Sequence, residues 1–147
     1  EIQADTLEEV ALFGIKEVTE KLTGPVMIED AGLFIDALRG FPGVYSAYVF
    51  DTIGNEGILR LLDGAQDRRA VFRSVLAYAE PGTEPIFFSG ELAGEIASGP
   101  RGSGGFGYDP IFEVGGKTIA EMNLAEKNSI SHRGASIHAL REWLSTR

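Results

Sequence analysis

The feature of the sequence that most constrains the fold is a pair of strand-like segments, 69–79 and 85–96, separated by the turn residues Pro81 and Gly82. Apolar and polar residues alternate in both segments, which is the period of a strand with one buried face. Pro and Gly between two such runs favour a turn. The sequence therefore predicts two long strands that pair as a hairpin.

Helix signals lie on both sides of these strands in the sequence. Thr6 and Glu9 have the spacing of a capping box, and apolar residues then recur every three or four positions until Gly24-Pro25 ends the pattern. A second capping box at 123–126 opens the helical C-terminal part. Further predicted elements are a helix over roughly 52–62, short strands at 26–28 and 111–114, and a glycine-rich loop at 98–110. Helices together with hairpin-like strand pairs predict an α/β fold with a mixed sheet.

Composition bounds the size and class of the protein. A chain of 147 residues can bury a sizeable core, and no repeat or linker divides it, so residues 1–147 are expected to form one domain. The absence of cysteine excludes disulfides and thiolate chemistry. No apolar stretch approaches the ~20 residues that span a bilayer, so we expect no membrane partner and a cytoplasmic protein.

The charge balance limits the partners. Thirteen Lys and Arg against 22 Asp and Glu give a formal net charge of −9. A protein that binds a polyanion such as duplex DNA neutralises the phosphates with basic side chains, so this balance argues against a nucleic-acid partner. It permits a small phosphorylated ligand where basic residues and a divalent cation gather locally.

The glycines concentrate in one loop. Residues 102–107 spell the dinucleotide-binding pattern G-x-G-x-x-G, but that pattern needs a helix after it, and here Tyr108-Asp109-Pro110 leads into an apolar strand. Residues 116–118 are like the end of a Walker A loop, but Ile111 stands where its first glycine should be. Neither nucleotide loop fits. Two explanations remain for the glycines of this loop: a ligand approaches the backbone closely, or the segment is an ordinary hairpin loop.

Two polar clusters are candidates for chemistry. Glu29 and Asp30 follow a short apolar strand, and adjacent carboxylates at a strand end can form a magnesium site or supply a general base. The alternative for this pair is a solvated loop or helix cap. Lys127, His132 and Arg133 place three possible cations near a helix start, which suits an anion or a carbonyl oxygen. The alternative for them is a solvated helix surface.

Four blocks stand in order along the chain. They are Glu29-Asp30-Ala31-Gly32-Leu33, Phe41-Pro42-Gly43-Val44-Tyr45-Ser46-Ala47, Gly104-Gly105-Phe106-Gly107-Tyr108-Asp109-Pro110-Ile111-Phe112 and Ser131-His132-Arg133-Gly134. In this order they resemble the signature blocks of the inosine triphosphate pyrophosphatase family, the nucleoside triphosphatases also called dITP/XTP diphosphatases. The resemblance covers essentially all 147 residues, and four ordered blocks are far more specific than any single loop.

The resemblance implies an elongated mixed α/β fold and a homodimer. It also implies Mg²⁺-dependent hydrolysis of ITP, dITP and XTP to the monophosphate and pyrophosphate. In that scheme Asp30 is the general base that activates water and is also a metal ligand, while Glu1 and Glu29 are carboxylates near the metal. The residues implied to bind the purine nucleoside triphosphate are Ala31, Phe106, Gly107, Tyr108, Asp109, Lys127, His132 and Arg133.

The same resemblance assigns roles within this set. Phe106 would stack on the purine, and residues 107–109 would complete the wall of the base site. Lys127 would hold a phosphate or the base. His132 and Arg133 would read the 6-oxo edge, which distinguishes these purines from adenine.

The sequence departs from the family pattern in two places. Position 31 is Ala where many relatives carry Ser, which removes a hydroxyl contact to the substrate. The family also opens with a strand and a Thr/Ser-x-Asn-x-x-Lys loop that grips the triphosphate, and neither precedes Glu1, so we expect an N-terminally incomplete domain. The alternative to an active enzyme is a catalytically silent purine-nucleotide-binding remnant or an inactive fragment.

Overall fold

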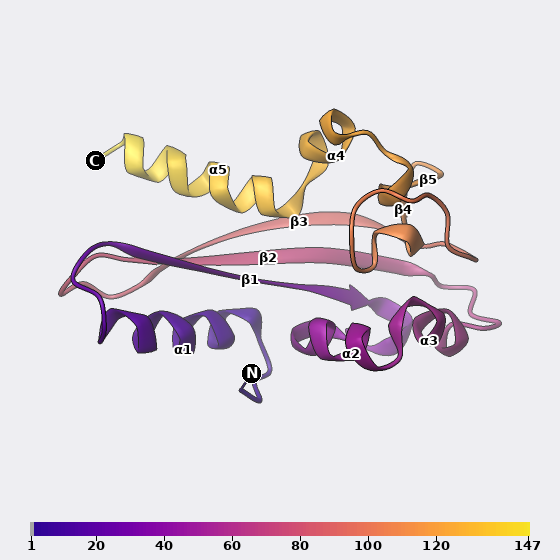
Figure 1. Cartoon of the computed structure of the whole chain (residues 1–147), viewed down its shortest axis with the longest axis horizontal. Coiled ribbons are helices and arrows are strands. Elements are labelled where there is room, and N and C mark those ends of the chain that lie inside the picture. The colour runs from indigo at the N-terminus through magenta and orange to yellow at the C-terminus, as the bar shows by residue number, and fades with distance from the viewer. Residues whose placement is uncertain (1) are drawn as a thin grey trace.

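A long antiparallel sheet runs along the molecule, and helices cover both of its faces (Figure 1). The structure, a computed structural model, describes residues 2–147. The strands are hydrogen-bonded in chain order: β1 (Val26–Ile35), β2 (Arg69–Ala79), β3 (Ile86–Ile96), β4 (Phe112–Val114) and β5 (Lys117–Thr118). The hairpin predicted from the two alternating segments is confirmed as β2 and β3.

The sheet is antiparallel, whereas the sequence predicted a mixed one. Every ladder among residues 2–147 pairs its two strands antiparallel. The helices between β1 and β2, namely α2 (Ser46–Thr52) and α3 (Gly54–Leu61), stay beside one end of the sheet (Figure 1). The chain therefore returns without the crossover that a parallel neighbour needs. The elongated α/β architecture with flanking helices is confirmed.

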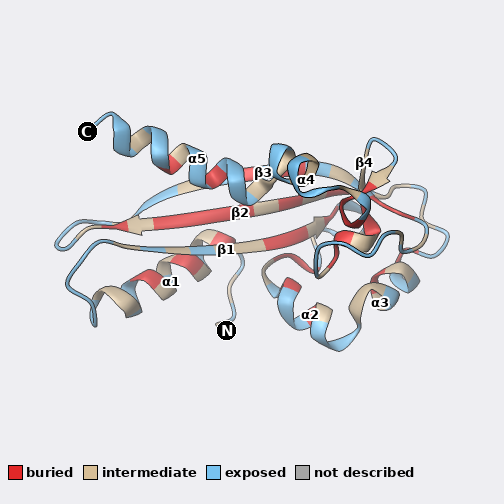
Figure 2. Cartoon of the chain, turned by 45° about the horizontal axis from the view of Figure 1, so that its top comes forward, coloured by how far each residue is buried: buried red, intermediate tan, exposed pale blue. Residues whose placement is uncertain are grey.

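One face of β1 and β2 is covered by α1 (Leu7–Thr19). Thr6 is the predicted N-cap, because its hydroxyl oxygen accepts a hydrogen bond from the Glu9 amide at 3.1 Å. The Glu9 carboxylate accepts from the Asp5 amide at 3.2 Å rather than from that of Thr6, so only half of the predicted capping box forms. One stripe of the helix is buried against alternate residues of β2, and the buried residues of this cluster are Leu7, Ala11, Ile15, Val75, Ala77 and Ala79. Figure 2 shows β2 buried along much of its length.

The opposite face carries α5 (His132–Ser145), which follows the short α4 (Leu124–Ile130). The predicted capping box at the start of α4 is confirmed, since the Asn123 side chain accepts from the Glu126 amide at 2.8 Å. Ser131 separates the two helices and caps α5 by accepting from the Gly134 amide at 3.2 Å. This break places the first residues of α5 against the sheet.

The helix predicted over 52–62 is two helices, and the first begins earlier, at Ser46. Gly54 has a φ of +62°, a left-handed conformation that interrupts the helical backbone. After this break in the chain, Ile58 of α3 is fully buried in a core shared with Leu33 and Phe112. No helix within residues 2–147 combines the length and the apolar character needed to cross a membrane.

β1 is longer than the strand predicted at 26–28. It continues to Ile35 because each of its residues pairs with one in β2, which outweighs the local preference of charged residues and glycine for turns. At Gly32 a Cβ atom would collide with the Gly43 carbonyl oxygen, so glycine allows the following loop to pass close. Glu29 and Asp30 therefore lie within a strand, and successive strand side chains point to opposite faces.

Candidate functional site

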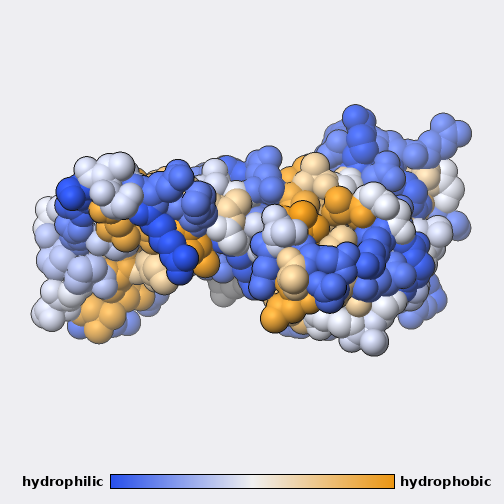
Figure 3. Space-filling view, turned by 90° about the horizontal axis from the view of Figure 1, so that it is seen from above, coloured by the Kyte–Doolittle hydropathy of each residue, from blue (hydrophilic) through white to orange (hydrophobic). Residues whose placement is uncertain are grey.

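A pocket of about 490 Å³ opens between β1, α2, the glycine-rich loop and the start of α5. All of the residues predicted to bind substrate line it: Ala31, Phe106, Gly107, Tyr108, Asp109, Lys127, His132 and Arg133. Further lining residues that the sequence reasoning did not single out include Ser46, Phe50, Asp51 and Phe72. Figure 3 shows apolar surface gathered in the centre of the right half of the view, with hydrophilic surface around it.

The glycine-rich loop presents Phe106 to solvent. This residue is 65% exposed, which is unusual for a large apolar residue. The Lys127 ammonium lies 4.7 Å from the centroid of the ring, and the centre of the Arg133 guanidinium lies 5.6 Å from it. An exposed aromatic ring with two cations close by suits a flat ligand ring that carries acceptor oxygens.

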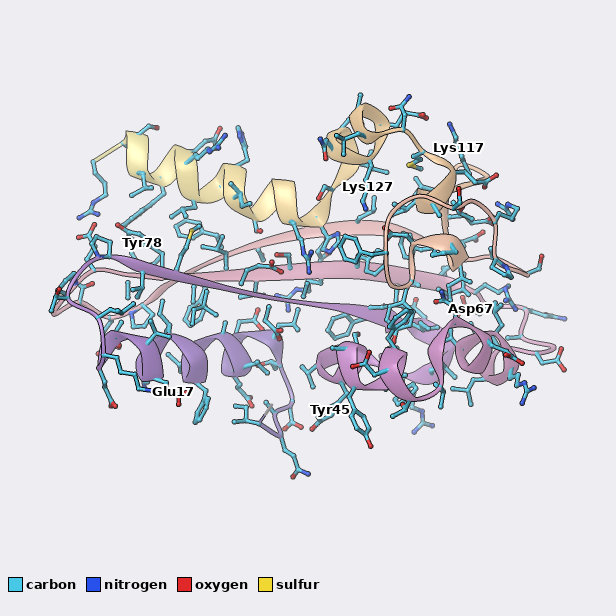
Figure 4. All side chains as sticks on the ribbon, in the orientation of Figure 1. Glu17, Tyr45, Asp67, Tyr78, Lys117 and Lys127 are labelled. Carbon is cyan, nitrogen blue, oxygen red and sulfur yellow. The ribbon has the colours of Figure 1, made fainter. Side chains whose placement is uncertain are left out.

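Asp109 fixes the shape of this loop. Its Oδ2 atom accepts a hydrogen bond from the Phe106 amide at 3.1 Å and pairs with the Lys127 ammonium at 2.8 Å. Figure 4 shows Lys127 on the side of α4 that faces the sheet. At Gly105 (φ +67°) a Cβ atom would collide with the Asp109 carboxylate, so this turn accepts only glycine. One carboxylate thus holds the loop closed on itself, with Phe106 exposed on it.

Two contacts tie the same loop to the helices after β1. Tyr108 donates its hydroxyl proton to the Ser46 carbonyl oxygen at 2.7 Å, and burial raises the pKa of Tyr108 to about 12. The side-chain amide of Asn55 donates a hydrogen bond to the Gly107 carbonyl oxygen at 3.1 Å. Tyr108 is therefore a neutral wall of the pocket whose hydroxyl is engaged with the backbone. Sequence spacing contained no signal for these contacts, because they join segments far apart in the chain.

His132 is a neutral side chain, although the sequence analysis counted it among three possible cations. Its ring stacks on Phe72 with a centroid distance of 5.0 Å and an interplanar angle of 10°. Burial, followed by the positive charge of Arg133, lowers the pKa of His132 to about 4. A neutral imidazole donates one hydrogen bond and accepts another, so His132 offers a polar edge to the pocket without a charge.

Glu29 lies on the face of the sheet that carries α5. Its Oε1 atom is 3.3 Å from Nε of Arg133 and accepts a hydrogen bond from the Ser74 hydroxyl at 3.4 Å. The prediction placed Glu29 and Asp30 together at the end of a strand, and that placement is wrong. Because they are consecutive residues of β1, their carboxylates diverge.

Asp30 lies on the other face, in register with Val75 of the α1 cluster. Its Oδ2 atom is buried. Glu1, the third predicted metal carboxylate, lies outside the described residues. Within residues 2–147 no three Asp, Glu or His side chains are grouped closely enough to hold a metal ion.

Comparisons with known proteins give a consistent result. The model of the Ham1 family matches residues 1–143. A dITP/XTP pyrophosphatase of Methanopyrus kandleri is 56% identical over 145 residues, which are 97% of this chain and 77% of the relative. A dITP/XTP pyrophosphatase of Thermococcus kodakarensis is 55% identical, over 98% of this chain and 78% of the relative.

Solved structures agree in fold. The Ham1 protein of Staphylococcus aureus is similar with a TM-score of 0.93 and 38% identity, over 99% of this chain and 80% of that chain. A nucleoside-triphosphatase, also called dITP/XTP pyrophosphatase, from Mycobacterium abscessus gives a TM-score of 0.82 at 34% identity, over 95% of this chain and 76% of that chain.

Proposed function

Because the chain belongs to the Ham1 family, we propose that it is a nucleoside triphosphate pyrophosphatase acting on the non-standard purine nucleotides ITP, dITP and XTP. The reaction releases the monophosphate and pyrophosphate and so removes these nucleotides from the pool. The single observation that carries the proposal is the pocket in which exposed Phe106 lies close to both Lys127 and Arg133.

The base site follows from the pocket walls. Phe106 stacks on the purine, and Gly107 and Tyr108 form the adjoining wall. Arg133 and Lys127 donate hydrogen bonds and suit the 6-oxo group of hypoxanthine or xanthine, which is an acceptor. The 6-amino group of adenine is itself a donor and would leave these groups unpaired. Ala31 contributes backbone and a methyl group at the pocket floor, where a Ser would add a hydroxyl.

The reaction needs a proton acceptor and charge neutralisation at the phosphates. Carboxylate oxygens are the donors that Mg²⁺ prefers, so Asp30 fits this cofactor and would hold it together with Glu1. The bound ion would offset charge on the phosphates and polarise the attacking water. Asp30 would take the proton of that water as general base. Glu29, which the resemblance also placed near the metal, pairs with Arg133 on the other face of the sheet.

We place this activity in the cytoplasm, where the nucleotide pool lies, and expect a homodimer. The net charge of −9 disfavours nucleic acid as a partner. Large exposed apolar side chains, among them Phe13 and Tyr48, give the surface apolar area that a second copy could cover. Size-exclusion chromatography with light scattering tests this, and a monomer at micromolar concentration would remove the dimer.

The test of the function is product analysis. The full-length protein is incubated with ITP, with and without Mg²⁺, and pyrophosphate and orthophosphate are measured separately. Pyrophosphate with IMP, dependent on Mg²⁺, is the expected result. Binding of ITP without any turnover would instead support the alternative, a catalytically silent purine-nucleotide-binding protein.

A further inference from the structure

Glu29 connects the sheet to the helix that carries Arg133. Its carboxylate contacts Nε of Arg133 at 3.3 Å and the Ser74 hydroxyl at 3.4 Å. Arg133 is the second residue of α5, and Ser74 lies on β2 beside Ala31 of β1. One carboxylate thus joins three elements at the rim of the pocket.

Behind this carboxylate lies a pair of serines. The hydroxyls of Ser74 and Ser136 are 3.0 Å apart, and both residues are fully buried between β2 and α5. The Ser136 hydroxyl also donates a hydrogen bond to the Arg133 carbonyl oxygen at 2.9 Å. The Ser136 hydroxyl has one proton and two acceptors within 3.0 Å, the Arg133 carbonyl oxygen and the Ser74 oxygen, while Ser74 donates its own proton to Glu29. Buried polar groups require such partners, so the chain of contacts holds Glu29 in place.

The backbone of α5 is fixed at the same point. Gly90 of β3 pairs with Ser74 in the sheet register. A Cβ atom at Gly90 would collide with the His132 carbonyl oxygen and with Ala135, so the first turn of α5 rests directly on the strand. This close approach fixes the position of the Arg133 backbone, and the Glu29 carboxylate contacts the Arg133 side chain.

We infer that Glu29, supported by Ser74 and Ser136, is a positioning residue that orients the Arg133 guanidinium over the Phe106 platform and thereby sets selectivity for 6-oxopurines. The inference rests on the proposed function. Arginine has a long, flexible side chain, and ordering it costs conformational entropy. A contact through Nε orders the chain before the ligand arrives and keeps the terminal amino groups as donors for the base.

The test is Glu29→Gln, which keeps the size of the side chain and removes its charge. The matched control is Glu91→Gln on β3, whose carboxylate also pairs with an arginine, Arg73, at 3.3 Å. For both variants we would measure kcat and KM for ITP and ATP, the Mg²⁺ concentration for half-maximal activity, and the dissociation constant of IMP without metal.

A positioning role predicts a specific pattern for Glu29→Gln. KM for ITP and the dissociation constant of IMP rise about tenfold, since the ion pair that orders the Arg133 side chain is lost. The ITP/ATP ratio of kcat/KM falls while the Mg²⁺ requirement stays that of the wild type. Ser74→Ala gives the same pattern with a smaller rise, and Glu91→Gln behaves as wild type.

A raised Mg²⁺ requirement with unchanged IMP affinity and unchanged selectivity would make Glu29 a metal ligand and overturn the inference. If the wild type releases no pyrophosphate from any purine triphosphate, the proposed function fails. The IMP measurement then decides separately: weaker binding by Glu29→Gln supports the positioning role, and equal binding overturns it. Circular dichroism of each variant shows whether the fold is retained.

Discussion

The two faces of β1 have different chemistry. On the face that carries α5, Glu29 pairs with Arg133 beside an open pocket lined by aromatic side chains. On the face that carries α1, Asp30 lies among the residues that pack against the helix. We expect the two carboxylates, which are adjacent in sequence, to have separate tasks: Glu29 positions Arg133 for base recognition, and Asp30 acts in hydrolysis. Strand geometry places the two side chains on opposite faces of the sheet.

The largest expected effect is on turnover and comes from the face of β1 that carries Asp30. Asp30→Asn should lower kcat for ITP by about 10²–10⁴, because it removes the proton acceptor. Selectivity between ITP and ATP should stay the same, since the pocket face is untouched. Steady-state kinetics at saturating Mg²⁺ measure this. Asp36→Asn, which alters an exposed ion pair with Arg69 at 3.7 Å just after the same strand, is the control and should keep wild-type turnover.

Wild-type turnover in a folded Asp30→Asn protein would contradict the assignment of the base. Loss of activity that accompanies unfolding, judged by circular dichroism, would give Asp30 a structural role instead.

The next effect concerns the pocket face. Arg133→Ala removes the guanidinium that faces Phe106, so ITP turnover should fall and the ITP/ATP ratio of kcat/KM should narrow by about tenfold or more. Competition assays with both nucleotides measure the ratio. Arg141→Ala, an exposed residue later in α5, is the control. An unchanged ratio would place base recognition elsewhere.

Removal of the stacking platform should have a similar or smaller effect. Stacking of a base on an aromatic side chain contributes about 1–3 kcal/mol, so Phe106→Ala should raise KM for ITP about fivefold or more. KM for ATP should rise as well, because stacking does not distinguish the two purines. Phe87→Ala, which truncates an exposed aromatic residue on β3, should leave both values unchanged. Equal KM values for Phe106→Ala and the wild type would exclude stacking.

The smallest effect is the pH dependence of stability contributed by His132. Its pKa is about 4 in the folded state, below the ordinary 6.5, so the unfolded chain binds more protons between these values. His132 therefore contributes to the free energy of unfolding in full above about pH 6.5, and this contribution is lost as the pH falls toward 4. Its size is on the order of 1 kcal/mol after allowance for the partial exposure of the ring. Urea unfolding of His132→Gln should show a weaker pH dependence than wild type.

His138→Gln is the matched control, since that histidine pairs with Glu142 on the exposed side of α5. The same pH dependence in His132→Gln and the wild type would contradict a neutral, buried His132.

Local patterns predicted much of the fold. The β2–β3 hairpin followed from alternation and a Pro-Gly turn, and the caps at Thr6 and Asn123 followed from their spacing. The length of β1 could not be predicted, because Glu29, Asp30 and Gly32 favour a turn locally and only pairing with β2 keeps them extended. Tertiary pairing overrides local preference in this way.

The pocket residues were identified from the resemblance to a family, and the structure brings them together. The contacts of these residues could not be predicted from the sequence, because the ion pair of Arg133 with Glu29 and the stacking of His132 on Phe72 join distant segments. The neutral state of His132 depends on its burial, which spacing does not reveal. Residue types could therefore be predicted, while their charge states and partners required the packed fold.

The most direct test of the central claim, a pocket that selects 6-oxopurine triphosphates, is the ratio of kcat/KM for ITP to that for ATP in the full-length protein. Sites that recognise a polar group by matched hydrogen bonds can discriminate by about 10⁴, and we predict a preference for ITP approaching that size, with pyrophosphate as the product. Equal kcat/KM values for ITP and ATP, measured in the same Mg²⁺ buffer, would contradict the account.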